Sequence, residues 1–430
     1  MIAAQLKLVV DPNHRAQSPP WRVGDAIAPN DFEAIRRRLM LDHCKWDVQV
    51  GDISTLAPFA LILRHDIWRQ LAEFAEALFA EMEEAEKELL TQPKLIDRLA
   101  LPRRLKRAFA GEYADELTPG IARVARFDFH WTDEGWRTSE VNSDVPGGFC
   151  EASSLSQMMA SHYPGATDAG DVADAWAVAM ARKLQPGATA GLVCAVGYME
   201  DQQVTAYLAK CLERRGIRAH LVRATELVWD RGRALIVRGG QKTQLDAIVR
   251  FYQGEWLVHL PSQCWRCMIR SGRTPVCNPP SAILSESKRF PLVWDELGVP
   301  MSTWRKLLPE SRDPREVNWR KDPGWLLKSA FCNNGDDVIC RAWLTPRDWQ
   351  RASFWARLRP SQWVAQRRFK SVAAETAMGP MYPCVGVYVV DGQAAGAYGR
   401  LSAGPVINYS AIDVAILVDP GNSGGSTQHE

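Results

Sequence analysis

The sequence predicts an α/β fold of mixed α+β character, with a helical N-terminal region and a small separate α/β lobe. Three observations support this class: helical spacing through residues 30–118, a strand-helix-strand pattern in residues 190–252, and β-hairpin patterns after residue 275. We divide the chain into a helical N-terminal region (1–118), a hairpin with following helices (119–185), the small α/β lobe (186–274), a C-terminal lobe (275–418) and a flexible tail (419–430).

The N-terminal region contains the longest predicted helix. In IWRQLAEFAEALFAEMEEAEKELL, residues 67–90, apolar residues recur every three or four positions and acidic residues occupy the other side. This spacing is typical of a helix that buries one face against a core. We expect this region to be scaffold.

A predicted hairpin follows, in ARFDFHWTDEGWRTSEVN, residues 125–142. Aromatic residues alternate with polar ones in its first arm, which is typical of a half-buried strand. Residues 133–135, Asp-Glu-Gly, predict a three-residue turn with glycine in the left-handed position. With that turn, Asp128 lies opposite Glu140 and Arg126 lies opposite Asn142.

The opposed carboxylates of Asp128 and Glu140 have two interpretations. Like charges across a β-ladder destabilise it unless a cation lies between them, and hard oxygen ligands favour Mg²⁺. Alternatively, the acidic residues form a solvated face, because a two-residue turn at Glu134-Gly135 shifts the register and removes the pairing. The residues alone leave both interpretations open.

The small α/β lobe is predicted from four consecutive segments. GLVCAVGYM (191–199) reads as a buried strand, VTAYLAKCLERRG (204–216) as an amphipathic helix ended by glycine, and IRAHLVRA (217–224) and DAIVRFY (246–252) as further strands. Gly197 belongs to no GxGxxG pattern, so a dinucleotide site is not expected.

Two lysines of the C-terminal lobe are candidate phosphate ligands. Lys328 ends an apolar strand just before a turn containing Asn333, Asn334 and Gly335, whose backbone donors suit a nucleotide phosphate. Lys288 lies at a predicted helix start. For each lysine, a solvated surface position is the alternative.

A later strand and hairpin supply the remaining candidates. The segment from Trp363 to Gln366 could present backbone groups to a purine, although a core strand explains it equally. Arg400 ends a hairpin turned by Asp391-Gly392, and its alternative is a surface arginine.

Composition excludes several classes of protein. The 430 residues are 46% hydrophobic and 24% charged, and 52 basic against 50 acidic residues give a net charge of +2. We therefore expect no nucleic-acid or membrane partner. No run approaches the ~20 apolar residues of a membrane span, and the start is unlike a signal peptide, so a cytoplasmic protein is expected. Oligomeric state cannot be read from the residues.

Taken together, these motifs resemble the synthetase domain of glutathionylspermidine synthetases and their relatives, which are ATP-grasp amide ligases. The matching motifs occur in the family's order and span residues 120–405: Arg126-Phe-Asp128, Glu140-Val-Asn142-Ser-Asp144-Val-Pro146, Asn278-Pro-Pro with Lys288, Lys328-Ser-Ala-Phe-Cys-Asn-Asn-Gly335, Trp363-Val-Ala-Gln366 and Ala395-Gly396-Ala-Tyr-Gly-Arg400. The set as a whole is specific to this family, although no single motif is.

The resemblance implies an ATP-grasp-like fold, with 275–418 as the nucleotide-binding lobe, and a role for each candidate. Asp128, Glu140 and Asn142 would hold the Mg²⁺ ions that bridge the ATP phosphates, and Arg126 and Arg400 would be catalytic. ATP would be bound by Lys288, Lys328, Gly335, Trp363 and Gln366. Such a ligase phosphorylates a carboxylate on a small molecule or peptide, and an amine or polyamine-type acceptor then displaces phosphate from the acyl phosphate.

The chain also departs from the family. Its phosphate loop, SAFCNNGDD, lacks the family's proline, first glycine and arginine, and no cysteine-peptidase-like amidase domain is expected before the synthetase region. Glutathione and spermidine are therefore not assigned as substrates. The alternative hypothesis is a catalytically degenerate ATP-binding protein that acts through partner contacts.

Overall fold

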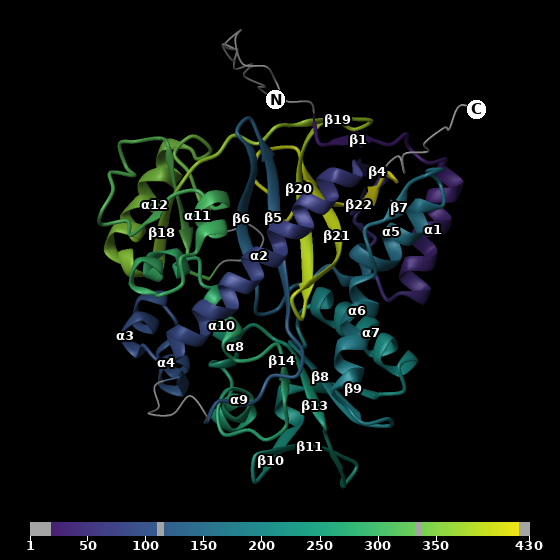
Figure 1. Ribbon diagram of the computed structural model, residues 1–430, viewed down its shortest axis with the longest axis vertical. Helices are drawn as coiled ribbons and strands as arrows, with labels where there is room; N and C mark the ends of the chain where they lie inside the picture. Colours follow the sequence, from purple (N-terminus) through teal and green to yellow (C-terminus); the bar gives the residue numbers. More distant parts are fainter. Residues whose placement is uncertain (1–18, 110–115, 332–337, 421–430) are drawn as a thin grey trace, which may run out of the picture.

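The fold is organised around one large central sheet, shown near the middle of Figure 1. The computed structural model describes residues 19–109, 116–331 and 338–420. The nine-stranded sheet has the order β1-β4-β22-β21-β20-β5-β6, with β19 beside β20 and β7 beside β22. The strand bounds are Trp21–Val23 (β1), Leu56–Leu63 (β4), Val124–Thr132 (β5), Gly135–Asn142 (β6), Thr167–Asp168 (β7), Ala374–Thr376 (β19), Gly379–Val390 (β20), Gln393–Ser402 (β21) and Ile412–Val418 (β22).

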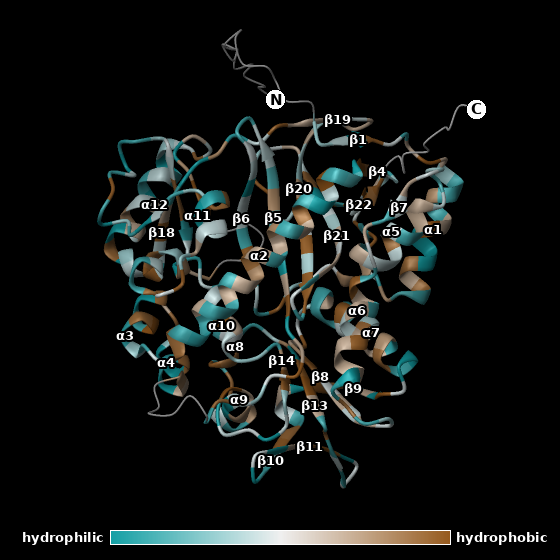
Figure 2. Ribbon diagram, in the orientation of Figure 1, coloured by the Kyte–Doolittle hydropathy of each residue, from teal (hydrophilic) through white to brown (hydrophobic). Residues whose placement is uncertain are grey.

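Helices pack on both faces of the central sheet. On one face lies α2 (His65–Leu90), whose buried residues have the predicted spacing and include Leu71, Ala75, Leu78, Phe79, Met82 and Leu89. The opposite face packs against α5 (Ser156–Ala160) and α6 (Val172–Arg182). Figure 2 shows hydrophobic colour along β20 and mixed colour along α2, as expected for a helix with one buried face.

The N-terminal region is not wholly helical, which corrects the prediction for residues 1–118. Besides α1 (Pro29–Asp42) and α2, it contributes β4, which pairs in parallel with β22 in the central sheet. The sequence of β4, LAPFALIL, is almost continuously apolar because the strand is buried on both faces. Such a run lacks the alternation that distinguishes a strand from a helix.

The small α/β lobe agrees with its prediction. It contains a parallel sheet of order β14-β13-β8-β9, with α7 (Met199–Arg214) connecting β8 to β9. The bounds are Thr189–Cys194 (β8), Arg218–Arg223 (β9), Ala247–Phe251 (β13) and Val276–Cys277 (β14). The lobe also contains an antiparallel meander that the patterns did not indicate, formed by Leu227–Asp230 (β10), Arg233–Arg238 (β11) and Gln241–Gln244 (β12).

Residues 275–418 are not one continuous lobe, which corrects the predicted division. One part forms a separate antiparallel sheet of order β15-β18-β16-β17, packed against α12 (Pro346–Leu358). Its strands are Ser311–Arg312 (β15), Trp325–Ser329 (β16), Val338–Ile339 (β17) and Trp363–Arg367 (β18). The later part returns to the central sheet, because the apolar hairpin of β20 and β21, turned at Asp391-Gly392 as predicted, pairs with β5.

The remaining elements are short and connect these units. They are Gln49–Val50 (β2), Ile53–Ser54 (β3), Pro93–Ile96 (α3), Arg103–Phe109 (α4), Gly254–Leu257 (α8), Ser262–Ile269 (α9), Ala282–Glu286 (α10) and Ser302–Leu307 (α11). Most of the predicted flexible tail, residues 421–430, lies outside the described residues. Within the described parts of the chain, no helix has both the length and the apolar character needed to cross a membrane.

Candidate active site

The predicted hairpin exists, but its turn differs from the prediction. Thr132 pairs with Gly135, so the loop contains two residues rather than three. A regular ladder with this loop would place Asp128 opposite Ser139. A β-bulge at Ser139 inserts one residue into β6, and Asp128 therefore pairs with Glu140 and Arg126 with Asn142, as predicted.

The bulge also provides a contact to the C-terminal lobe. Lys328 at the end of β16 is buried, and its Nζ donates a hydrogen bond to the carbonyl oxygen of Ser139 at 2.9 Å. The Ser139 hydroxyl lies 3.1 Å from Nε2 of His130 on the facing strand. The lysine that was predicted to bind phosphate is thus hydrogen-bonded directly to the hairpin that was predicted to bind the metal.

The carboxylate of Asp128 lies among polar groups of its own hairpin. Nε and Nη2 of Arg126 donate to its two oxygens at 2.7 and 2.9 Å, and Nδ2 of Asn142 donates to Oδ2 at 3.2 Å. Because Asn142 uses its amide N–H for Asp128, its remaining acceptor is the amide oxygen. The three side chains form one connected polar cluster.

Glu140, across the ladder from Asp128, lies among three cations. Its Oε2 lies 3.3 Å from Nζ of Lys288, which also lies 3.5 Å from Glu286 Oε1. Burial raises the pKa of Glu140, but Lys288, Lys328 and Arg126 outweigh it and hold that pKa at about 2. Glu140 is therefore ionised at neutral pH.

The donor set of the hairpin fits a divalent cation with oxygen ligands. Asp128 and Glu140 supply carboxylate oxygens on paired strands, and Asn142 retains an amide oxygen. Among the residues that the structure describes, no group of three or more His, Cys, Asp and Glu side chains could hold a metal ion. An ion at the hairpin would thus have two protein carboxylates available, and phosphate oxygens or water would complete its coordination, as is common for Mg²⁺.

The two predicted catalytic arginines lie on strands that flank β20. Arg126 on β5 donates to the Tyr398 hydroxyl at 3.2 Å and lies over its ring, with the guanidinium carbon 5.3 Å from the centroid. Arg400 on β21 is partly buried, and its Nη2 donates to the carbonyl oxygen of Asn408 at 3.1 Å. Tyr398 lies two residues before Arg400 on β21, so the two side chains point to the same face of that strand. Because Arg126 contacts Tyr398, the two arginines lie on the same face of the central sheet.

Most of the predicted site residues line one cavity of about 610 Å³. It is lined by Arg126, Asp128, Glu140, Asn142, Lys328, Gln366 and Arg400. The central sheet, the antiparallel sheet of β16 and β18, and the small α/β lobe all contribute to its walls. The volume lies within the range of cavities that bind small molecules.

The other predicted nucleotide residues lie elsewhere. Trp363, the first residue of β18, packs on the core of the antiparallel sheet and is not among the lining residues; only Gln366 of that strand reaches the cavity. Lys288 is not a lining residue, but its ammonium group pairs with Glu140, which lines the cavity. The backbone N–H of Lys288 donates a hydrogen bond to the carbonyl oxygen of Ala330 at 2.8 Å. Gly335 lies outside the described residues.

The structure also shows a charged cluster in the cavity wall that the sequence did not reveal. Nζ of Lys45 lies 2.9 Å from Asp47 and 3.2 Å from Asp413, and it also pairs with Glu151. Glu151 and Asp413 are distant in the chain from Lys45 and Asp47, and no local pattern links the four residues. His130 on β5 also lines the cavity, and burial lowers its pKa to about 4.

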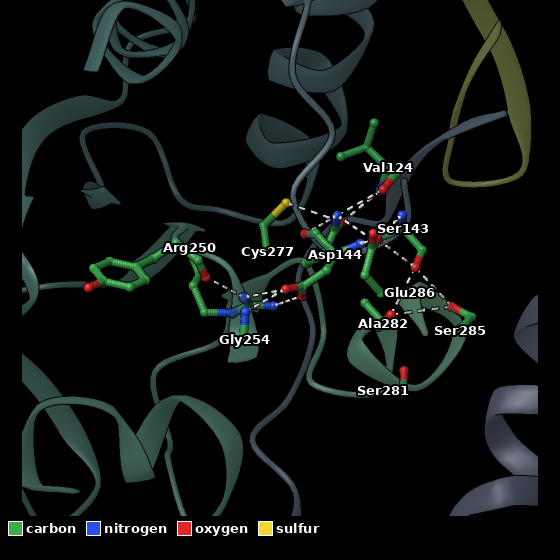
Figure 3. A network of polar contacts seen from close by, with 12 residues as sticks. Val124, Ser143, Asp144, Arg250, Gly254, Cys277, Ser281, Ala282, Ser285 and Glu286 are labelled. Atoms are coloured by element: carbon green, nitrogen blue, oxygen red, sulfur yellow. Dashed lines mark hydrogen bonds and ion pairs between the residues drawn. The ribbon is translucent and has the colours of Figure 1, made fainter. Parts of the chain in front are cut away.

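A buried polar network fixes the end of the hairpin to the small lobe (Figure 3). Asp144 pairs with Arg250 at 3.0 Å, and the Gly254 N–H donates to it at 2.8 Å. Glu286 accepts the backbone N–H groups of Ser143 and Asp144 at 2.7 and 3.0 Å. Asp144 is thus a structural link and does not line the cavity.

Comparisons with known proteins agree with this architecture. Residues 60–419 match the family described as glutathionylspermidine synthase preATP-grasp. A glutathione synthetase-like effector from Globodera pallida, solved in its apo form, is 13% identical with a TM-score of 0.57, over 91% of this chain and 99% of that one. That likeness shows a shared fold.

Two further solved structures are more distant. A putative gamma-glutamylcysteine synthetase from Methylobacillus flagellatus is 11% identical with a TM-score of 0.40, over 76% of this chain and 88% of that one. D-alanyl-alanine synthetase A from Vibrio cholerae is 12% identical with a TM-score of 0.33, over 55% and 90%. No curated protein sequence matches the chain significantly.

Proposed function

Since the chain belongs to the glutathionylspermidine synthase preATP-grasp family and is an ATP-grasp carbon–nitrogen ligase, we propose that it forms an amide or peptide bond through an acyl phosphate. ATP and Mg²⁺ would be required, and ADP and phosphate would be the products. The acid would be a small molecule or peptide, and the acceptor an amine. The observation that carries the proposal is the Asp128–Glu140 pair, held by a bulge in the same cavity as Lys328, Arg126 and Arg400.

Asp128, Glu140 and Asn142 are the residues that would hold Mg²⁺. When bound, the ion would supply charge neutralisation between the phosphates of ATP. Glu140 is suited to this because its low pKa keeps it ionised. Arg126, which pairs with Asp128, and Lys288, which pairs with Glu140, hold the two carboxylates in place.

Phosphoryl transfer would use the cations of the cavity wall. An oxygen of the substrate carboxylate attacks the γ-phosphorus, the bond to the β-phosphate oxygen breaks, and ADP leaves. Lys328 and Arg400 would neutralise the phosphoryl group, and Arg126 the carboxylate. This step needs positioning and charge neutralisation and requires no nucleophile from the protein.

Amide formation would follow in the same cavity. The neutral amine attacks the acyl carbon, phosphate leaves with the electrons of the C–O bond, and the nitrogen loses one proton to solvent or phosphate. Arg126 and Arg400 would stabilise the oxyanion of the tetrahedral intermediate, as preorganised donors do in acyl transfer.

The direct test supplies purified protein with Mg-ATP and pools of carboxylic acids and amines. ADP and phosphate should appear only when both an acid and an amine are present. AMP and pyrophosphate would contradict the mechanism. Acid-dependent ADP release without an amide would indicate an acyl-phosphate-forming kinase, and tight ATP binding without turnover would favour the degenerate binding protein.

A further inference from the structure

The helix α12 presents a group of large apolar side chains to solvent. Phe354, Trp355 and Leu358 are 62%, 49% and 59% exposed, and the ring centroids of Phe354 and Trp355 lie 5.6 Å apart. Single apolar residues on a surface are ordinary, whereas a group of large ones marks an interaction site. The outer face of α12 is therefore a candidate interaction surface.

The inner face of the same helix is already occupied. Trp349, Ala352 and Ala356 pack on the core of the antiparallel sheet. Because an α-helix has 3.6 residues per turn, Phe354 and Leu358 lie on the side opposite Ala356. These exposed side chains are thus not part of the core of the chain that α12 covers.

Exposed arginines surround the apolar side chains. They are Arg347, Arg351, Arg357 and Arg359. Within the parts of the chain that the structure describes, none of the four forms an ion pair. Arg347 and Arg351 lie on the same strip of the helix as Phe354 and Leu358, because positions i, i+4, i+7 and i+11 share one face. Asp348 is the only acidic residue of α12, so the outer face is positively charged around an apolar centre.

The complement of this face is a surface that offers negative charge and apolar contact together. Neither the 610 Å³ cavity nor a second cavity beside the hairpin tip is lined by Phe354, Trp355 or Leu358. The three side chains project from the outside of a helix, whereas peptides commonly dock in a groove. A nucleic acid would pair with the arginines and leave Leu358 without an apolar partner. An anionic lipid surface supplies both kinds of contact.

We propose that the outer face of α12 binds the surface of membranes that contain anionic lipids. Phe354, Trp355 and Leu358 would enter the boundary between headgroups and acyl chains, and the arginines would stay level with the lipid phosphates. The contact is peripheral, because the other face of this 13-residue helix packs against the protein. The inference is independent of the proposed ligase function.

Co-sedimentation of the full chain with lipid vesicles at low salt tests the proposal. Vesicles of phosphatidylcholine with about 30% phosphatidylglycerol should bind the protein about tenfold more tightly than vesicles of phosphatidylcholine alone. Arg347→Glu/Arg351→Glu should weaken binding to the anionic vesicles by about tenfold or more, because two attractive charges become repulsive. Phe354→Ser/Trp355→Ser should weaken it by a similar factor through the loss of apolar contact.

Two control variants match these changes elsewhere on the surface. Arg37→Glu/Arg38→Glu makes the same change in net charge at exposed positions of α1, which lies on the opposite side of the molecule from α12 in Figure 1. Ile53→Ser removes an apolar side chain that is 71% exposed. Both variants should retain most of the binding to anionic vesicles. Circular dichroism checks the fold of each protein.

The remaining outcomes identify other occupants or none. The inference is overturned if the natural chain does not sediment with the anionic vesicles, or if the folded α12 variants bind them as the natural chain does. Equal losses in the α1 and α12 arginine variants would also overturn it, because net charge alone would then explain binding. Binding of polyglutamate without vesicle binding would assign the face to an acidic protein, and binding of duplex DNA without vesicle binding would assign it to nucleic acid.

Discussion

Glu140 illustrates how single residues of the site depend on their neighbours. Its pKa of about 2 results from three cations that overcome the effect of burial. Lys288 comes from the segment after α10, Lys328 from β16 and Arg126 from the facing strand. The charge state of one carboxylate is thus set by its own hairpin and by two segments that are distant in the chain.

Replacing Glu140 with glutamine should abolish ligase activity without unfolding the protein. The amide cannot supply the charge that a divalent ion requires, so kcat should fall by about 100-fold or more. ADP release measures the effect, and circular dichroism checks the fold. Glu134→Gln, at the exposed tip of the same hairpin, should be close to neutral. An active Glu140→Gln enzyme would remove the hairpin from the catalytic site.

Arg400→Ala should lower turnover more than it lowers ATP affinity. We expect kcat to fall by about 100-fold, because Arg400 is proposed to act on charge that moves during the reaction, while the ATP dissociation constant changes only a few-fold. Kinetics beside a calorimetric ATP titration separate the two effects. Lys242→Ala on the exposed β12 is the control. Equal losses in affinity and turnover would assign Arg400 to ground-state nucleotide binding.

At the scale of elements, the hairpin of β5 and β6 shows what sequence patterns can and cannot predict. The alternation of Phe127 and Phe129 with polar residues correctly predicted which side chains share a face. The predicted turn was one residue too long, and the bulge at Ser139 restored the predicted pairing of Asp128 with Glu140. No local pattern marks that bulge: Ser139 contacts His130 across the hairpin, but its carbonyl oxygen accepts a hydrogen bond from Lys328 on another sheet.

The central sheet packs against α2, so removing a buried side chain of that helix should destabilise the protein. Leu78 is fully buried against the sheet, and Leu78→Ala should lower the free energy of unfolding by about 2–5 kcal/mol. Urea denaturation followed by tryptophan fluorescence measures this loss. Leu41→Ala, at a position that is 64% exposed, should cost far less. Similar losses for both variants would show that α2 is not the scaffold.

At the scale of the whole molecule, the pairing of strands that are far apart in the sequence limited what could be predicted. The order of motifs was readable, and most of the predicted site residues line one cavity. The return of β20–β22 to the central sheet and the parallel pairing of β22 with β4 were not readable, because they join residues from both ends of the chain. The ion cluster of Lys45, Glu151 and Asp413 depends on the same pairing.

The contact between the small lobe and the hairpin predicts how stability depends on pH. Burial, followed by the charge of Asp144, raises the pKa of Glu255 from 4.5 to about 8. Between those pH values the folded protein holds a proton that the unfolded chain has lost, so this group makes stability fall as pH rises. Glu255→Gln should remove that contribution.

Thermal unfolding from pH 5 to pH 8.5 tests this expectation. The difference in Tm between Glu255→Gln and the natural chain should shift in favour of the variant as pH rises. Glu375→Gln, at an exposed position of β19, should follow the natural chain throughout. A Tm difference that does not change with pH would show that Glu255 does not titrate in this range.

The parallel pairing of β22 with β4 has a consequence for biosynthesis. The ribosome releases β4 some 350 residues before β22, and until then the edge of β4 that β22 will cover has no partner. Nascent chains that stop short of residue 412 would expose this edge and that of β21, and unpaired edges promote aggregation. Chaperone protection during translation should therefore matter more for this protein than its ordinary composition suggests.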